Sequence, residues 1–364
     1  MKRREFLQKA GGAATVGAAA TALAAPAIAK GIRQMDIVSS WPRDFPGIGI
    51  SAQRMAARIT ELSEGRIKTT YYAAGEKVGA FDVFDTVASG DAQAYSAAEY
   101  YWKGKHPALA FFTTVPFGMT VVERNAWLKF GGGQELWDEV TDQFGLKALP
   151  CGATGTQMGG WFNKEIVTVD DLKGLKMRIP GLGGDVMSKL GASPVSLPGS
   201  QIFENLVSGA IDATEWIGPY NDYFMKFYEA AKFYYWPGMH EPSATLSFSM
   251  NKKWWSGLSK WEQAIITAAA MEENAAQYDE AQANNGKYLA KMIEENGVVL
   301  KSFDDDIYDE FASASEEVMK ETRDHSALAK KVHDQFFAAL KEIGGWQNIA
   351  EIAFSKQRNR ILDL

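Results

Sequence analysis

The sequence predicts an α/β protein with two domains and a helical C-terminal region, on three observations. Between residues 35 and 95, strand-like and helix-like apolar patterns alternate. The chain has 364 residues, more than the roughly 250 to 300 that one core usually holds. After residue 251 the pattern is almost wholly helical. A strand-helix-strand-helix-strand order implies a parallel sheet with helices on both faces.

The first 29 residues have the pattern of an export signal. Paired arginines, Arg3 and Arg4, precede Phe6-Leu7, and a weakly hydrophobic Ala/Gly-rich run ends at Ala27-Ile28-Ala29. This predicts a twin-arginine signal peptide and a periplasmic protein. A membrane anchor is the alternative, but the apolar run is short for a spanning helix. Cleavage would remove a net charge of +3 and change the formal charge from −7 to −10.

This acidic composition excludes several functions. It argues against a nucleic-acid partner and offers no basic patch for a membrane surface.

The single cysteine, Cys151, cannot form a disulfide within the chain. There is no zinc-type Cys/His spacing, no phosphate-binding Gly-rich loop and no Gly-x-Ser-x-Gly motif. The sequence therefore lacks the usual parts of a catalytic site.

The N-terminal elements are expected in a regular order. Strands are predicted at residues 35–41 and 66–72. A helix with Met55, Ile59 and Leu62 on one face lies between them and is ended by Gly65, and a second helix is predicted at 80–89. A third strand begins after Gly90, and ligands of parallel sheets gather where strands end. Tyr100 and Tyr101 follow that strand and are candidate walls of a binding cleft; packing against a helix is the alternative.

A second unit follows a Gly-rich stretch. Before that stretch the pattern predicts helices at 125–129 and 134–144. After it, the pattern predicts the strand-like run 174–180, helices at 183–190 and 200–208, and strands at 193–197, 211–216 and 245–251. A capping-box pattern at 259–262 (SKWE) starts a long helix that runs towards Asn285 or beyond. Further helices are expected at 304–322 and 326–342, with a last one after Trp346. An exposed charged face or a dimer contact would explain their pattern.

Arg178 is the strongest candidate for a binding residue. It lies in the strand-like run 174–180 (GLKMRIP), which stops at Pro180-Gly181. A buried guanidinium requires an anion, and its planar fork suits a carboxylate. The partner would be an acidic residue of the chain or a ligand. Glu215 also lies at a predicted strand end, where it would be Arg178's partner, a metal ligand, or both.

Three motifs carry a resemblance to a known family. They are 155–162 (GTQMGGWF), 174–178 (GLKMR) and 211–220 (IDATEWIGPY). They resemble the solute receptors of tripartite ATP-independent periplasmic (TRAP) transporters, most closely the branch that binds 2-oxo or 2-hydroxy monocarboxylates such as pyruvate and lactate. The resemblance covers essentially the whole mature chain. It implies two α/β lobes that close on a ligand, with long connecting helices, as in type II periplasmic binding proteins.

The resemblance also implies roles for single residues. Arg178 matches the arginine that pairs with the ligand's carboxylate. A bridging sodium or calcium ion would be held by Gln157, Glu215, the backbone carbonyl of Trp216, and Glu241 in 236–241 (WPGMHE). The expected ligand contacts are Arg178, Gln157, Tyr100, Tyr101, Trp216 and Ala153. Relatives carry asparagine where this chain has Ala153, a departure that bears on the exact ligand.

Charge considerations agree with a cation. Glu215 and Glu241 in one closed cleft would repel each other and the ligand's carboxylate without one. Oxygen ligands suit a hard ion, and two uncompensated negative charges slightly favour calcium over sodium. The alternatives are a receptor for a polyol or sugar, and an exported enzyme with Glu215 or Glu241 as general base.

We expect the following organisation from the sequence. Residues 1–29 form the signal, 30–150 the first lobe and 151–250 the second lobe. Segments within 240–364 form helices that cross between the lobes and pack on them. The resemblance further implies a homodimer formed through the C-terminal helices, and membrane subunits of a TRAP transporter as partners.

Overall fold

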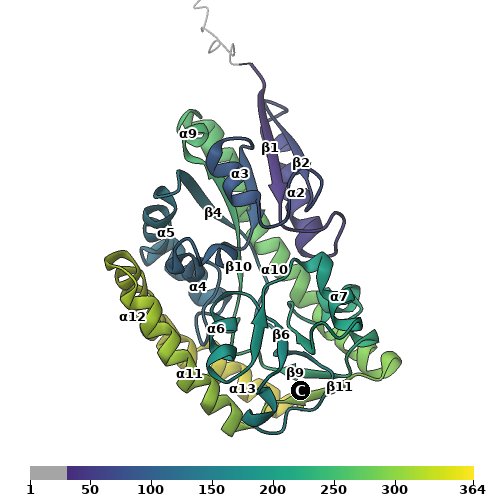
Figure 1. The fold of residues 1–364 in the computed structure, drawn as a ribbon. Coiled ribbons are helices and arrows are strands. Elements are labelled where there is room, and N and C mark those ends of the chain that lie inside the picture. Colours follow the sequence, from purple (N-terminus) through teal and green to yellow (C-terminus); the bar gives the residue numbers. More distant parts are fainter. Residues whose placement is uncertain (1–30) are drawn as a thin grey trace, which may run out of the picture. The chain divides into compact units, whose positions relative to one another are not determined.

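The computed structural model describes residues 31–364, and the expected export signal lies outside them. The chain divides into two units, Met1–Arg33 and Gln34–Leu364. The second unit contains two β-sheets, each covered by helices (Figure 1). The α/β fold expected from the sequence is therefore present.

The first sheet has five strands in the order β2-β1-β3-β10-β4. Strands β1 and β3 are parallel, whereas β10 runs antiparallel to both β3 and β4. The strands are β1 (Arg33–Ser39), β2 (Ile67–Tyr72), β3 (Ala94–Ala97), β4 (Leu146–Ala153) and β10 (Thr245–Asn251). The helices of this region are α2 (Ile48–Leu62), α3 (Val83–Ser89), α4 (Val121–Phe130), α5 (Gly133–Asp142) and α9 (Lys252–Ser256).

The second sheet has six strands in the order β11-β9-β5-β8-β6-β7. Its strands are β5 (Gly160–Phe162), β6 (Lys176–Arg178), β7 (Ser193–Val195), β8 (Ala213–Thr214), β9 (Phe233–Trp236) and β11 (Val299–Ser302). Helices α6 (Gly181–Lys189), α7 (Gly199–Val207) and α8 (Pro219–Met225) connect them. Strand β6 is parallel to both β7 and β8, so the ends of β6 and β8 lie side by side.

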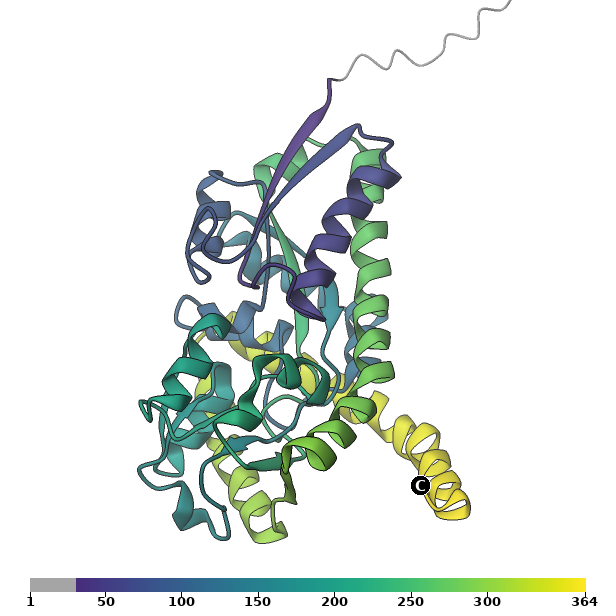
Figure 2. The same cartoon turned by 90° about the vertical axis from the view of Figure 1, so that its right-hand side faces the viewer.

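Helix α10 (Lys260–Asn296) joins the two halves of this unit. It packs on α2 and β4 near the first sheet and on α8 near the second, and Figure 2 shows it running alongside α2. Its N-terminus has the capping box expected from the sequence, in which Ser259 Oγ accepts the Glu262 N–H. Helices α11 (Asp305–Asp324), α12 (Ala327–Ile349) and α13 (Glu351–Leu362) complete the chain.

Three features differ from the sequence expectation. Both sheets are mixed, because β10 and β5 run antiparallel to their neighbours. Strand β10, which we expected within 151–250 and the second lobe, pairs with strands of the first sheet. The region after residue 251 also contributes β11 to the second sheet. Local patterns predicted most strands. They could not predict which strands pair, because pairing depends on contacts between segments that are far apart in the sequence.

Aromatic side chains form much of the core. Phe112 stacks between Trp127 and Trp137, with ring centroids 5.8 and 5.4 Å away. Trp161 stacks on Tyr234 at 4.0 Å. These tryptophans are fully buried, so they serve packing rather than a cleft. Among residues 31–364, no helix is long and apolar enough to cross a membrane.

Candidate functional site

Arg178 lies at the end of β6 with its side chain almost completely buried. Nη1 donates to the side-chain Oε1 of Glu215 and to its backbone carbonyl (3.2 Å), and Nε donates to the Leu197 carbonyl (3.1 Å). The guanidinium also lies over the Trp216 ring, 5.2 Å from its centroid. Nη2 has no hydrogen-bond partner. The internal ion pair is thus present, and one donor of the fork remains for a ligand.

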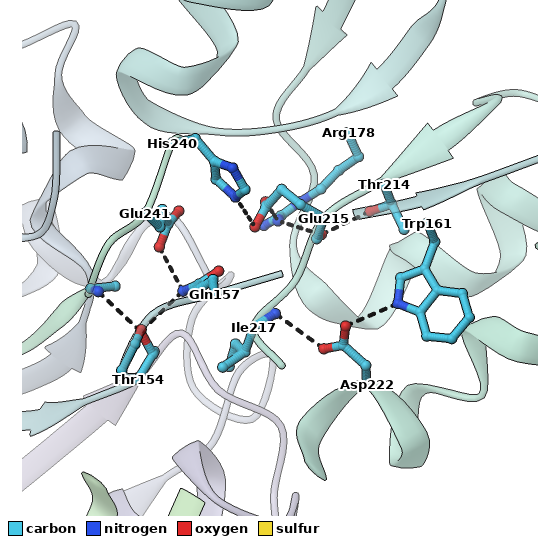
Figure 3. Close-up of polar contacts among 12 residues, drawn as sticks. Thr154, Gln157, Trp161, Arg178, Thr214, Glu215, Ile217, Asp222, His240 and Glu241 are labelled. Carbon is cyan, nitrogen blue, oxygen red and sulfur yellow. Dashed lines mark hydrogen bonds and ion pairs between the residues drawn. The ribbon is translucent and has the colours of Figure 1, made fainter. Parts of the chain in front are cut away.

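Glu215 follows β8 and is completely buried. Its Oε1 accepts from Arg178, and its Oε2 lies 3.3 Å from His240 Nε2 (Figure 3). This arrangement follows from the parallel pairing of β6 with β8, where Arg178 is opposite Thr214. Burial by itself lowers the pKa of Arg178, but the charges of Glu215, the two tyrosines Tyr100 and Tyr101, and Glu241 together outweigh it and the pKa is raised.

Glu241 lies beside these residues and is also buried. Its Oε2 accepts from Gln157 Nε2 at 2.7 Å, while Oε1 has no partner. Burial raises the pKa of Glu241 well above its usual value, and the nearby charge of Glu215 raises it further. Ligand atoms of Glu215, His240 and Glu241 all lie within 4.8 Å of one another.

Gln157 is held in place by the Gly-rich loop before β5. Its backbone N–H donates to the Glu241 carbonyl (3.0 Å), and its own carbonyl accepts from Gly238 N–H (2.9 Å). Gly160 has φ of 123°, and a Cβ there would lie 2.7 Å from the Thr214 carbonyl oxygen. Only glycine allows this close approach of the start of β5 to β8. The side-chain Oε1 of Gln157 is left without a partner.

A small cavity of about 20 Å³ adjoins these side chains. It includes Tyr100, Tyr101, Gln157 and Trp216, four of the expected ligand contacts. Ala153 is not among the lining residues; it pairs with Thr245 between β4 and β10, next to Thr154, which does line the cavity. The remaining lining residues are Trp41, Ile48, Ala98, Ile217, Ala244 and Leu246.

Tyr100 and Tyr101 connect the cavity to the charged groups. Burial raises the pKa of Tyr101 to about 12, although the charge of Arg178 lowers it. The pKa of Tyr100 is likewise raised by burial, and next by the charge of Glu241. Both hydroxyls therefore stay protonated and can donate a hydrogen bond.

The buried polar atoms fit a cation and an acid. Unpartnered acceptors are present at Gln157 Oε1 and Glu241 Oε1, and an unpartnered donor at Arg178 Nη2. Buried polar atoms without partners are rare, because each one costs free energy. The acceptors are amide and carboxylate oxygens, the ligands that sodium and calcium prefer.

Sequence reasoning missed some of the surroundings. The sequence assigned no role to His240, and the structure places it against Glu215. Trp41 and Ile48 lie on the cavity wall although they come from the segment after β1. The only sequence signal for this part of the cavity wall was the predicted strand end at Trp41.

Comparison with known proteins agrees with this geometry. The family model of bacterial extracellular solute-binding proteins, family 7 (DctP), matches residues 38–325. The chain belongs to this family. The resemblance to TRAP receptors and the expected extracytoplasmic location are thereby confirmed.

Individual relatives of this DctP-family receptor are similar over nearly their whole length. A monocarboxylate 2-oxoacid-binding periplasmic protein of Nostoc sp. is 39% identical over 362 residues, 97% of this chain and 98% of the relative. A TRAP periplasmic solute-binding protein from Pseudoalteromonas atlantica, solved with bound sodium and pyruvate, is 37% identical with a TM-score of 0.86. The match covers 89% of this chain and 99% of that one.

A third relative, from Bordetella bronchiseptica, is 32% identical to this DctP-family receptor. Its TM-score is 0.90, with 92% of this chain and 99% of that chain covered. It was solved as a mixed-occupancy dimer, with calcium and picolinate in one site and the other site apo. Sodium and calcium thus both occur with carboxylate ligands in the relatives, as the sequence led us to expect.

Proposed function

We propose that this receptor binds a small 2-oxo or 2-hydroxy monocarboxylate, pyruvate or a close analogue, together with a bridging cation. It then delivers the acid to the membrane subunits of a TRAP transporter. The observation that carries this proposal is the set of unpartnered buried atoms on Arg178, Gln157 and Glu241. A ligand carboxylate would accept a hydrogen bond from the free donor on Arg178, and a cation would bind the free acceptors on Gln157 and Glu241.

Each residue has a distinct part in the proposed site. Arg178 pairs with the ligand's carboxylate through its free Nη2 while it keeps Glu215. Gln157, Glu215, Glu241 and the carbonyl of Trp216 would hold the cation, which would also take the acid's neighbouring oxygen. The cation supplies positive charge among the carboxylates.

The charge balance favours calcium over sodium. Two glutamates and a ligand carboxylate against Arg178 leave two negative charges, which a divalent ion neutralises. The raised pKa of Glu241 allows a second solution, in which Glu241 keeps its proton and sodium suffices. The two solutions differ in the number of protons released on binding.

The apolar lining of the small cavity favours a short acid with a methyl group over a sugar. About 20 Å³ is little more than the space for one water molecule. The apolar wall at Ile48, Ala98 and Leu246 would accept a methyl group. Even pyruvate requires side chains of the walls to move, as in receptors that close on their ligand.

The test is to identify what the protein binds. Native mass spectrometry of the purified mature protein should show a co-purified acid and a metal ion. After dialysis against chelator, calorimetric titration with pyruvate and lactate should show binding that depends on added calcium or sodium. Glucose and glycerol serve as control ligands. Binding of pyruvate that ignores both cations, or tighter binding of a control, would contradict the proposal.

We propose that the receptor does not transform its ligand. The family is one of binding proteins, and the site's glutamates are tied to Arg178 and Gln157. Pyruvate incubated with the protein should be recovered unchanged in its NMR spectrum. Turnover above a protein-free control would instead support an exported enzyme.

We further propose a homodimer formed by the C-terminal helices. Helix α13 has no buried residue and packs mainly on α12; in Figure 2 it projects from the other elements. Its exposed apolar side chains are Ile352, Phe354, Ile361 and Leu362. A second copy would cover this face.

We also propose that the protein has two lobes. Residues 30–150 form the main part of the first lobe and residues 151–250 that of the second, with β10 assigned to the first sheet.

A further inference from the structure

Asp222 is a buried carboxylate that lies behind the candidate cation site. It is 1% exposed and belongs to α8. Its Oδ2 accepts from Trp161 Nε1 (2.9 Å), and its Oδ1 accepts from Ile217 N–H (3.1 Å) (Figure 3). Its Oδ2 also accepts from the Tyr234 hydroxyl (2.8 Å). Within residues 31–364, no lysine, arginine or histidine forms an ion pair with it.

This environment is costly for a charge. Burial raises the pKa of Asp222 to about 7, while hydrogen bonds from Trp161 and Tyr234 lower it. A neutral side chain of similar size would avoid the cost of burying an unpaired carboxylate. A buried negative charge here would be favourable if it acted on a neighbouring group of the cation site.

The peptide bond between Trp216 and Ile217 connects Asp222 to the site. Trp236-Pro237 is the sole cis bond among residues 31–364, so the bond before Ile217 is trans. In a trans peptide the N–H and the C=O point in opposite directions. Because the Ile217 N–H points at Asp222, the Trp216 carbonyl points away from Asp222.

The same turn is held from a second side. The carbonyl of Ile217 accepts the Met158 N–H at 3.1 Å, directly after Gln157. Trp216 and Ile217 both line the small cavity, and Glu215 precedes them. The Trp216 carbonyl is thus part of a turn whose orientation is determined by Asp222 on one side and Met158 on the other.

We propose that Asp222 is a positioning residue for the cation: through the Ile217 N–H it orients the Trp216 carbonyl and increases the negative charge on that oxygen. The proposal rests on the proposed function, which makes this carbonyl a cation ligand. A charged acceptor polarises the peptide group that donates to it. Outer partners of metal ligands typically change metal affinity by about 10- to 100-fold when replaced.

The first test is calcium affinity in the full mature chain, treated with chelator and titrated with calcium in excess pyruvate. Asp222→Asn should bind calcium about 10- to 100-fold more weakly than wild type. Tyr234→Phe is the matched control, because it removes another hydrogen bond to the same carboxylate but keeps the charge and the Ile217 contact. It should stay within about 3-fold of wild type.

A second pair of variants distinguishes a loss of calcium affinity from a folding defect. In Asp222→Asn the new amide could direct a donor at the Trp161 N–H, which has no acceptor to offer. The double variant Trp161→Phe with Asp222→Asn removes that conflict, and Trp161→Phe alone is its reference. The double variant should lose about 10- to 100-fold in calcium affinity relative to this reference.

Pyruvate affinity at saturating calcium separates positioning from general damage. If Asp222 acts through the cation, this affinity should return to within about 3-fold of the reference. Pyruvate binding that stays weak at every calcium concentration, or unchanged calcium affinity in both Asp222 variants, would overturn the inference. Wild-type protein that binds neither calcium nor pyruvate would instead reject the proposed function.

Discussion

Gln157 Nε2 donates to Glu241 Oε2 at 2.7 Å, while Gln157 Oε1 and Glu241 Oε1 are both buried without a partner. The two residues are 84 positions apart in the chain. Their backbones are also joined, by the Gln157 N–H and the Glu241 carbonyl. This double connection fixes the two residues relative to each other, which would lower the cost of ordering them around the proposed cation.

Replacing Arg178 should weaken acid binding strongly. Removing one partner of a buried charge pair costs about 2 to 5 kcal/mol, so Arg178→Ala should raise the Kd for pyruvate by roughly 30-fold to several thousand-fold. Arg178→Lys keeps the charge but loses the fork, and should fall between. Calorimetry measures this, with thermal unfolding as the control because Glu215 loses its partner. Wild-type affinity in Arg178→Ala would show that the acid lies elsewhere.

Replacing Glu241 should act through the cation. Glu241→Gln removes one negative charge from the proposed ligand set, and calcium affinity should fall on the order of 10-fold or more. Excess calcium should restore part of the pyruvate affinity in Glu241→Gln but none in Arg178→Ala. Titration of both variants at several calcium concentrations checks this. Equal rescue of the two variants would contradict separate roles for Arg178 and the cation.

Asp222 should make the stability of the cation-free protein depend on pH. Its pKa is raised to about 7 in the folded chain. At pH values between the pKa of the unfolded chain and about 7, the folded chain therefore binds a proton at Asp222 that the unfolded chain has lost. The free energy of unfolding should therefore fall as pH rises, on the order of 3 kcal/mol between about pH 5 and about pH 8.

The comparison that isolates this effect is denaturant unfolding of wild type and Asp222→Asn at both pH values. The variant lacks the titrating carboxyl and should show a smaller fall with pH. The same slope in both proteins would mean that Asp222 is not the group responsible.

Removing the chain after Gly344 should weaken any dimer and spare ligand binding. The truncation deletes α13 and the end of α12, where Trp346, Ile349 and Phe354 are exposed. Sedimentation should show a dimer for the full mature chain and a monomer for the truncated one, while pyruvate affinity stays within about 3-fold because no site residue is removed. A full-length monomer at micromolar concentration would remove the basis for this prediction.

Much of the fold could be predicted from local sequence. The capping box at Ser259, the strand containing Arg178 and the helices of the C-terminal region follow from patterns within one segment. The likeness to a receptor family also pointed to Arg178, Gln157 and Glu215 in three motifs and to Glu241 in 236–241, and the structure shows that all four are buried. Their roles in binding stay predictions.

Other features depend on the tertiary structure. Local patterns could not place β10 in the first sheet or β11 in the second, because strand pairing joins segments far apart in the chain. They also missed β4, β5, β9 and α8, and with α8 the position of Asp222. The contacts of His240 with Glu215 and of Asp222 with Ile217 arise only when separate elements pack together.

The sequence by itself thus determined the α/β class, the acidic composition and the residue types of the site, since these depend on local pattern and on the chemistry of single side chains. Only the tertiary structure decided that Arg178 is already paired with Glu215, and which donors and acceptors remain free. The physical reason is that hydrogen-bond satisfaction in a buried site is a property of the assembled group, and its members come from β6, the end of β8 and two loops.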